Sequence, residues 1–243
     1  MRYRNQIIII FSILAAAYFS GCVMNKLDDS PKTIVVRENS EGMSISLDVD
    51  TGEEWASRMQ AGPFIFNILP QMAIWIADEQ GRYLETLWVT GADFKKMKHA
   101  QKNGSGPAFF ADCLPVWASR LQAAGKSLPS KENPYPDTVT SATPMGDFTL
   151  ETKTTSGVPM ILYAEVNKSG DTSSFYTEDA NDWVGQPSLI YMVEIRETGK
   201  VGALRMELSG HGGLLEQEPG IYFDLSGFET AVRQIDKITV SFE

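Results

Sequence analysis

Residues 71–90 read QMAIWIADEQGRYLETLWVT, in which two apolar runs flank a polar loop at 78–81. Both runs have the length and the β-branched and aromatic content of strands, and Gly81 can take the positive φ that a tight hairpin loop needs. We therefore predict a β-hairpin with strands at 71–77 and 83–90. It is the clearest supersecondary unit in the chain and indicates a β-rich fold.

Short strand patterns surround this hairpin on both sides. Residues 43–49 alternate apolar and polar side chains, which is typical of a strand with one solvated face, and with 33–36 they are expected to form a first hairpin. Further strands are expected at 147–151, 161–166, 189–195, 203–208 and 237–242. Short strands joined by Gly, Pro, Asn and Asp clusters predict a mainly β protein, an antiparallel β-sandwich of immunoglobulin-like or jelly-roll-like type.

The stretch 92–136 breaks the strand pattern and is rich in Lys, Gly, Ser and Pro. Its helical signal runs from 114 to 124, because Asp112 and Pro115 suit a helix start and Gly125 suits a C-terminal stop. We expect one short helix within a long insertion between strands.

The first residues have the parts of a secretion signal. Arg2 and Arg4 supply positive charge, 7–19 is apolar but too short to cross a bilayer comfortably, and small residues precede Cys22. This arrangement resembles the lipobox of bacterial lipoproteins. The resemblance implies cleavage before Cys22, acylation of that cysteine, and attachment of the protein to a lipid membrane of the bacterial cell envelope, outside the cytoplasm.

The expected organisation is a signal peptide at 1–21, a lipidated flexible tether at 22–32 and a single β-sandwich domain at 33–243. Cleavage would move the formal charge from −10 to about −12, because two Arg are lost. This sign excludes a typical nucleic-acid binder, since phosphate backbones are bound by Lys and Arg. Cys113, the other cysteine, is expected to be a buried and inert thiol because its neighbours are apolar.

Three segments carry a likeness to a known family: AIWIADEQGRYLETL at 73–87, LPVW at 114–117 and DTVTSATPMGDF at 137–148. In this order they resemble an uncharacterised family of predicted bacterial periplasmic domains of unknown function. The resemblance covers about residues 70–195. It implies a periplasmic, β-rich module and no known reaction.

The stretch DTVTSAT at 137–143 is also similar to the motif on which flavin transferases attach FMN to a threonine hydroxyl. This resemblance implies Thr143 as the acceptor and Asp137 as the residue that orients the turn. Pro144 stands where the flavin motif usually has Ser or Thr. An electron-transfer protein with covalent FMN is therefore one alternative, and a turn shaped by side-chain to backbone hydrogen bonds is the other.

Carboxylate clusters at 48–54 and 178–182 have the ligand chemistry of a structural Ca²⁺ site, but neither has EF-hand spacing. Exposed acidic loops of this kind are usually only solvated. His99 and His211 have no second His or Cys at zinc-ligand spacing, so we expect no zinc site from them. Beyond these candidates the sequence predicts no cofactor.

Trp183 is the aromatic residue that the sequence favours for ligand contact, because it follows Asp182 in a polar loop, whereas Trp75, Trp88 and Trp117 lie in patterned core segments. Aromatic faces stack on sugar rings and carboxylates accept their hydroxyl groups, so a glycan-binding surface lipoprotein is a second alternative. The leading interpretation is a non-catalytic binding or assembly module of the cell envelope. It would act through its loops on an envelope protein or glycan.

Overall fold

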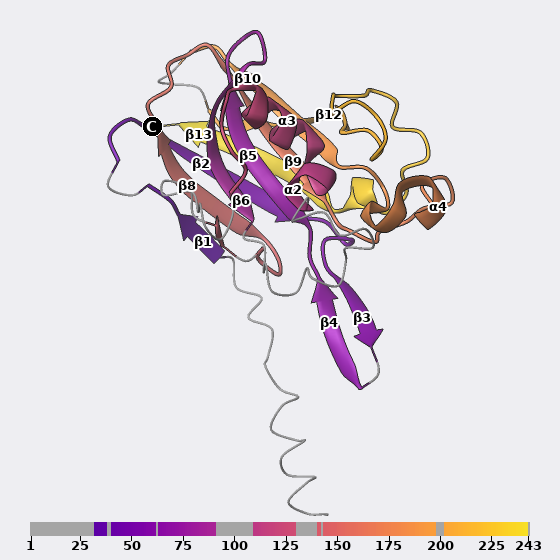
Figure 1. Cartoon of the computed structure of the whole chain (residues 1–243). Helices are drawn as coiled ribbons and strands as arrows, with labels where there is room; N and C mark the ends of the chain where they lie inside the picture. The colour runs from indigo at the N-terminus through magenta and orange to yellow at the C-terminus, as the bar shows by residue number, and fades with distance from the viewer. Residues whose placement is uncertain are drawn as a thin grey trace, which may run out of the picture.

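The computed structural model describes residues 32–37, 40–61, 63–90, 109–129, 140–141, 143–197 and 202–242. Two β-sheets pack face to face in this part of the chain, and short helices lie outside them (Figure 1). The predicted mainly β sandwich is confirmed. No helix among the described residues is long and apolar enough to span a membrane.

The sheets contain five and six strands. In spatial order the first holds β1 (Lys32–Val35), β8 (Phe148–Thr154), β2 (Met43–Thr51), β13 (Ile235–Phe242) and β11 (Leu204–Arg205). The second holds β12 (Glu207–His211), β10 (Leu189–Ile195), β9 (Met160–Asn167), β5 (Gln71–Ala77), β6 (Tyr83–Thr90) and β7 (Thr140–Ser141). A separate two-stranded sheet consists of β3 (Ser57–Ala61) and β4 (Phe64–Ile68).

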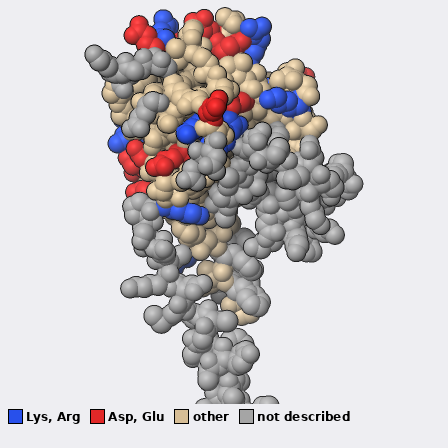
Figure 2. Space-filling view, turned by 90° about the vertical axis from the view of Figure 1, so that its left-hand side faces the viewer, with Lys and Arg blue, Asp and Glu red and all other residues tan. Residues whose placement is uncertain are grey.

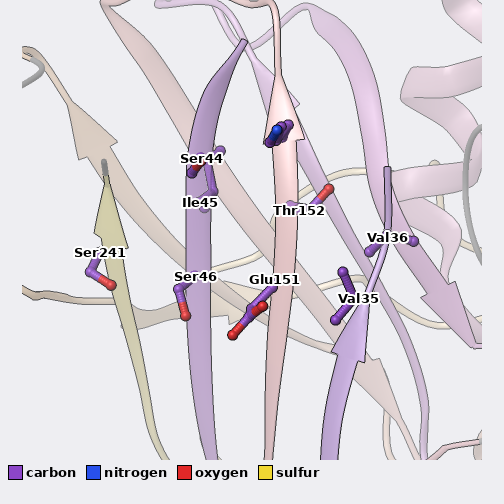
Figure 3. Close-up of a pocket in the computed structure, with 9 residues that line it drawn as sticks. Val35, Val36, Ser44, Ile45, Ser46, Glu151, Thr152 and Ser241 are labelled. Carbon is purple, nitrogen blue, oxygen red and sulfur yellow. The ribbon is translucent and has the colours of Figure 1, made fainter. Parts of the chain in front are cut away.

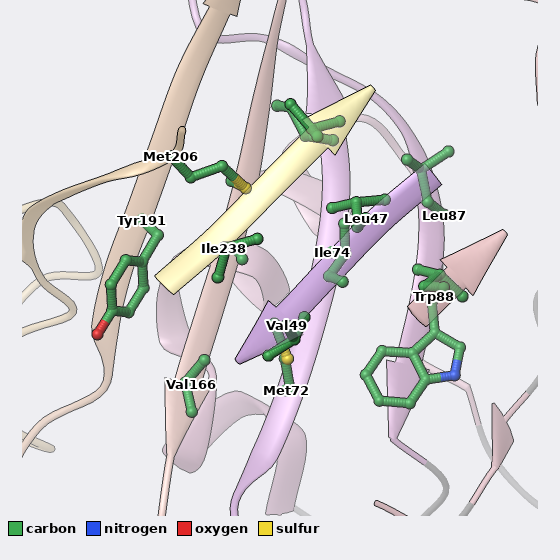
Figure 4. Packing of buried hydrophobic residues seen from close by; sticks show 14 of the residues in the cluster. Leu47, Val49, Met72, Ile74, Leu87, Trp88, Val166, Tyr191, Met206 and Ile238 are labelled. Atoms are coloured by element: carbon green, nitrogen blue, oxygen red, sulfur yellow. The ribbon is translucent and has the colours of Figure 1, made fainter. Parts of the chain in front are cut away.

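The main core lies between the two large sheets (Figure 4). Leu47 and Val49 of β2 and Ile238 of β13 meet Met72 and Ile74 of β5, and all five side chains are at most 1% exposed. Every second residue of these strands faces this core, as the period of a strand requires. For β2, the alternation that predicted the strand is therefore the alternation that builds the core.

A second apolar layer covers the outer face of the six-stranded sheet, where α3 (Pro115–Ala123) packs. Trp75 of β5 points into this layer and stacks on Tyr163 of β9 with 5.1 Å between ring centroids. Trp117 of α3 is fully buried in the same layer. Strand β5 is thus buried on both faces, which explains its unbroken apolar run.

The hairpin at 71–90 is confirmed: β5 and β6 are antiparallel neighbours and Gly81 has φ +74°. The predicted first hairpin is wrong. β1 pairs in parallel with β8, and β8 lies between β1 and β2. Alternation identified both strands but holds no information about which edge of the sheet each one joins.

The strand predicted at 203–208 is also wrong in one respect, because it breaks at Met206. β11 belongs to the five-stranded sheet and β12 to the six-stranded sheet. Met206 is 2% exposed in the main core, and its backbone N–H donates to the carbonyl of Ile238 at 2.9 Å. The buried methionine marks the corner at which the chain changes sheets.

The predicted helix at 114–124 is confirmed as α3, with Pro115 at its first turn. The structure adds short helical segments that the sequence did not predict. They are α2 (Phe109–Cys113), α4 (Glu178–Asn181), and the 3₁₀ turns η2 (Asp182–Val184) and η3 (Ala231–Arg233). The β3–β4 hairpin was missed too, because its apolar positions do not alternate over a full strand length.

Candidate functional site

Two loops at one end of the sandwich form the candidate site. The first is the β9–β10 loop at 168–188, which carries α4, and the second is the β12–η3 loop at 212–230 (Figure 1). Ser173 Oγ donates to the carbonyl of Gly227 at 2.8 Å, and the Leu215 N–H donates to Asn181 Oδ1 at 2.9 Å. These bonds join the two loops into one unit, which we call the two-loop surface.

A buried polar network lies beneath this surface and holds both loops. Asp171 accepts from Thr230 Oγ1 at 2.5 Å through one carboxylate oxygen and from Gln234 Nε2 at 2.8 Å through the other. Gln186 accepts from the Glu229 N–H at 2.8 Å and donates to Thr230 Oγ1. Lys168 is 3% exposed, with Nζ 3.9 Å from the Asp171 carboxylate.

Two glycines show how closely the loops pack. A Cβ at Gly185 would lie 2.6 Å from the carbonyl oxygen of Asp171, and a Cβ at Gly227 would lie 2.8 Å from Cβ of Phe175. Both have positive φ, +74° and +85°, which favours glycine. The network and these close approaches fix the backbone of the loops, so the surface is organised before any ligand arrives.

Aromatic rings run across the two-loop surface in contact with one another. Tyr176 packs against Phe175 and Phe228 with centroid separations of 4.9 and 4.8 Å, and Phe228 lies 5.3 Å from His211. Phe175 and Phe223 are 65% and 80% exposed. Large apolar rings held this far into solvent on a fixed backbone are typical of an interaction surface.

The two-loop surface is acidic. The loops 168–188 and 212–230 each contain four Asp or Glu residues, and the buried Lys168 is the only Lys or Arg in either loop. The face of the molecule in Figure 2, which lies away from α4, shows Lys and Arg interspersed with Asp and Glu instead. The charge of this surface would repel an anionic ligand.

The structure places Asp182 and Trp183, the residues that the sequence favoured, inside the β9–β10 loop. Asp182 is exposed, with φ +47°. Trp183 is half-buried against the layer beneath α3, and its carbonyl accepts from the Gly170 N–H at 2.8 Å. The sequence favoured a residue of this loop, whereas Phe175 and Phe223 are the more exposed rings among the described residues. No periodic pattern distinguishes those two phenylalanines.

The candidate flavin acceptor, Thr143, is half-buried and donates a hydrogen bond from its hydroxyl to the carbonyl of Pro70 at 2.7 Å. This bond gives the hydroxyl a role in the turn, and a phosphoester would remove the donated proton. Asp137 lies outside the described residues, as do Cys22 and His99.

The carboxylates at 48–54 have partners within the protein. Asp50 pairs with Lys237 at 3.1 Å, and Glu53 and Glu54 both pair with Arg233. In the described part of the chain, no group of three or more His, Cys, Asp and Glu side chains is placed to hold a metal ion. The calcium site therefore stays a prediction, because no set of ligands for it is placed together among the described residues.

Cys113 and His211 are both buried. Burial raises the pKa of the Cys113 thiol to about 12, so the group stays protonated, as expected for an inert cysteine. Burial lowers the pKa of His211, and its Nδ1 accepts from the Gly213 N–H at 3.1 Å. The histidine therefore supports the loop from below as a neutral ring.

Glu165 on β9 is a fully buried acid that sequence analysis missed. Its carboxylate accepts from the N–H groups of Val116 and Trp117 at 3.1 and 2.7 Å and from Ser188 Oγ at 2.6 Å. Burial raises its pKa to about 7. A Cβ on Gly212 would lie 3.1 Å from Glu165 Oε1, so no space for a substrate adjoins the carboxylate. Glu165 satisfies the first turn of α3 instead of a local cap.

A hollow of about 480 Å³ lies on the outer face of the five-stranded sheet (Figure 3). Ser44, Ser46, Glu151 and Ser241 line it, beside the exposed Val35. The buried Val36, Ile45 and Thr152 also line it, and no aromatic ring does. Because no aromatic ring is available for ligand contact in this hollow, the two-loop surface is the stronger candidate.

Comparisons with known protein families, with curated proteins and with solved structures found no match. The resemblance to a family of periplasmic domains therefore stays a prediction. The candidate site is argued from its own geometry.

Proposed function

We propose that this chain is a lipid-anchored protein of a bacterial cell envelope and that it binds an envelope component through the two-loop surface. The observation that carries the binding role is a rigid loop pair that exposes Phe175 and Phe223. The signal-like N-terminus and Cys22 support the location. The proposed role is a non-catalytic one, and it agrees with the engagement of Glu165, His211 and Asp171 near these loops by protein groups.

The charge of the surface defines the ligand chemistry. Exposed rings next to carboxylates suit a partner with Lys or Arg side chains, which gain cation–π contact and ion pairing together. A glycan is the second candidate, because sugar rings stack on aromatic faces and donate hydroxyl protons to carboxylates.

We expect a photoreactive benzoylphenylalanine at position 223 to crosslink to an envelope component in living cells. Phe223 is 80% exposed, so the substitution fits without strain. The control carries the same residue at Glu79, an exposed position in the β5–β6 turn. Protease digestion of the adduct separates the two candidates, since a protein partner is degraded and a glycan is not. Equal crosslinking from both positions would contradict the proposal.

We also expect the mature protein to begin at Cys22 and to carry acyl chains that hold it in the membrane fraction. The measurement is the intact mass, with Cys22→Ala as the variant that loses both acylation and membrane association. The same spectrum tests the flavin alternative, because covalent FMN on Thr143 would add its mass to the protein. We expect no FMN, since the Thr143 hydroxyl donates to Pro70. An unacylated soluble chain would overturn the proposed location.

A further inference from the structure

The β12–η3 loop folds around the ring of His211, the last residue of β12. His211 is 7% exposed, and its Nδ1 accepts from the Gly213 N–H at 3.1 Å. Its ring stacks on Tyr222 and lies against Phe228, with centroid separations of 5.4 and 5.3 Å. Its backbone also exchanges two hydrogen bonds with Tyr222, at 2.8 and 2.9 Å. One histidine therefore contacts the loop near its start, at its middle and near its end.

Phe223, an exposed ring of the two-loop surface, lies between two residues that His211 holds. Tyr222 precedes it and stacks on the imidazole. Asp224 follows it, and the backbone of Asp224 makes a hydrogen bond with the imidazole. The direction in which Phe223 faces solvent therefore depends on how the imidazole is held.

The loop contacts of His211 require a neutral ring. Nδ1 accepts a hydrogen bond from Gly213, so this nitrogen carries no proton and the other ring nitrogen is the donor. A proton added to Nδ1 would place two N–H donors opposite each other at 3.1 Å. The hydrogen bond between the ring and Gly213 would then be lost.

Gly213 cannot move away from a charged ring without moving Tyr222. Gly213 has φ +82°, and a Cβ on it would lie 2.6 Å from the Tyr222 ring. The backbone at Gly213 thus lies directly against that ring. A shift of Gly213 is expected to displace Tyr222 and the next residue, Phe223.

The titratable groups around His211 come from three parts of the fold. The β12–η3 loop contributes Tyr222 and the Asp224 carboxylate, which favours a charged imidazole. The β9–β10 loop contributes Tyr176, one ring further away. Strand β9 contributes Glu165, whose carboxylate lies under the start of the loop at 212.

The sign of the pH effect follows from burial. Burial outweighs Asp224 and lowers the pKa of His211 from its ordinary 6.5. In a released loop the ring is solvated and has its ordinary pKa, so protons favour release. The closed loop therefore keeps its full stability above pH 6.5 and loses it as the pH falls through the lowered pKa. Glu165 acts in the opposite direction, because burial raises its pKa.

We propose that His211 is a pH-sensitive latch of the two-loop surface: the neutral ring holds the β12–η3 loop in its binding form, and the protonated ring releases it. This inference rests on the proposed binding role of that surface. The ligand is then held at neutral pH and released in acid, which is a known use of buried histidines at interfaces. Because one proton is taken up, the ratio of released to closed loop rises by up to about tenfold per pH unit.

The test follows Phe223 by fluorine NMR, with 4-fluorophenylalanine at position 223 of the full acylated protein in detergent. Between about pH 7.5 and about pH 5, we expect the signal to shift to that of a second state. The shift should be absent from His211→Gln, whose side chain stays neutral. The matched control carries the same fluorinated residue at Leu84, which is 38% exposed on β6, and its signal should stay constant.

Two results would overturn the latch. One is a signal at position 223 that stays constant across this pH range, and the other is a shift that is equal in His211→Gln. A second measurement does not need that variant to fold. His99→Gln leaves His211 as the single histidine, so its ring signals can be titrated directly. Different midpoints for the histidine ring and for the fluorine signal would also contradict the proposal.

The fluorine signal needs no ligand, so it separates failure of the latch from failure of the proposed function. Crosslinking from benzoylphenylalanine at position 223 is compared in cells at about pH 7.5 and about pH 5.5. Loss of the adduct in acid supports the latch. No adduct at either pH, with a fluorine signal that titrates, overturns the binding role and leaves the latch as a property of the loop. Equal adducts at both values overturn the control of binding by His211.

Discussion

Replacing Glu165 by alanine is expected to lower the free energy of unfolding by at least about 3 kcal/mol, because three buried donors lose their acceptor at once. The donors are the N–H groups of Val116 and Trp117 and the hydroxyl of Ser188. The first turn of α3 would lose its polar contacts over the six-stranded sheet. Urea unfolding monitored by tryptophan fluorescence measures the change, since Trp75 and Trp117 are buried beside the helix.

The same residue predicts a pH dependence with a definite sign. The pKa of Glu165 rises from an ordinary 4.5 to about 7 in the folded state, mainly because burial disfavours the charge. Its contribution to stability is complete below pH 4.5 and is lost as the pH rises toward about 7. The rise of the pKa from 4.5 to about 7 corresponds to about 3 kcal/mol of folding free energy.

Glu165→Gln isolates this effect. The amide cannot ionise, so the fall in unfolding free energy between pH 4.5 and about 7 should disappear from this variant. His211 acts in the opposite direction, because burial lowers its pKa and its contribution is lost as the pH falls. The difference between the wild-type and variant curves removes the histidine contribution. Two parallel curves would show that Glu165 does not titrate in this range.

Replacing Asp171 by alanine is expected to cost about 3 kcal/mol and to release both loops of the candidate site. Asp171 accepts from Thr230 and Gln234 and faces the ammonium group of Lys168, which is 3% exposed. Without the carboxylate, these groups stay buried with fewer partners. Glu54 remains near Lys168, with its carbonyl 2.5 Å from Nζ, so the variant should still fold.

Asp50→Ala is the matched control. Asp50 makes an ion pair with Lys237 at 3.1 Å in which both side chains are nearly half exposed, so its loss should change stability by at most about 0.5 kcal/mol. Hydrogen exchange of 168–188 and 212–230 should increase in Asp171→Ala and stay unchanged in the control. Unchanged exchange in both variants would show that the buried network does not hold the two-loop surface.

The parts of the fold that the sequence predicted are those whose signals are local. The hairpin at 71–90 follows from two apolar runs and Gly81, and α3 follows from Pro115 and Gly125. The position of β1 could not be predicted, because its parallel partner begins at Phe148, far along the chain. The corner at Met206, where the chain changes sheets, could not be predicted either, because the sequence does not show which apolar side chain of this segment the core buries.

The sequence and the structure favour the same loop as a candidate, but the detail of the candidate site could not be predicted. Trp183 indicated the β9–β10 loop, yet the exposure of Phe175 depends on the close approach of Gly227 from a second loop. In the sequence, Glu165 is one polar residue within an apolar strand. Its role becomes visible only in the fold, where α3 packs over it. Such contacts join residues distant in sequence, and a single sequence holds no record of them.

Crosslinking from position 223 in living cells tests the central claim most directly, because it asks whether the two-loop surface meets a ligand where the protein works. We predict a discrete adduct from position 223, none from position 79, and loss of the adduct when Asp171→Ala releases the loops. The absence of any adduct from position 223 in cells that hold the folded, membrane-bound protein would contradict the account.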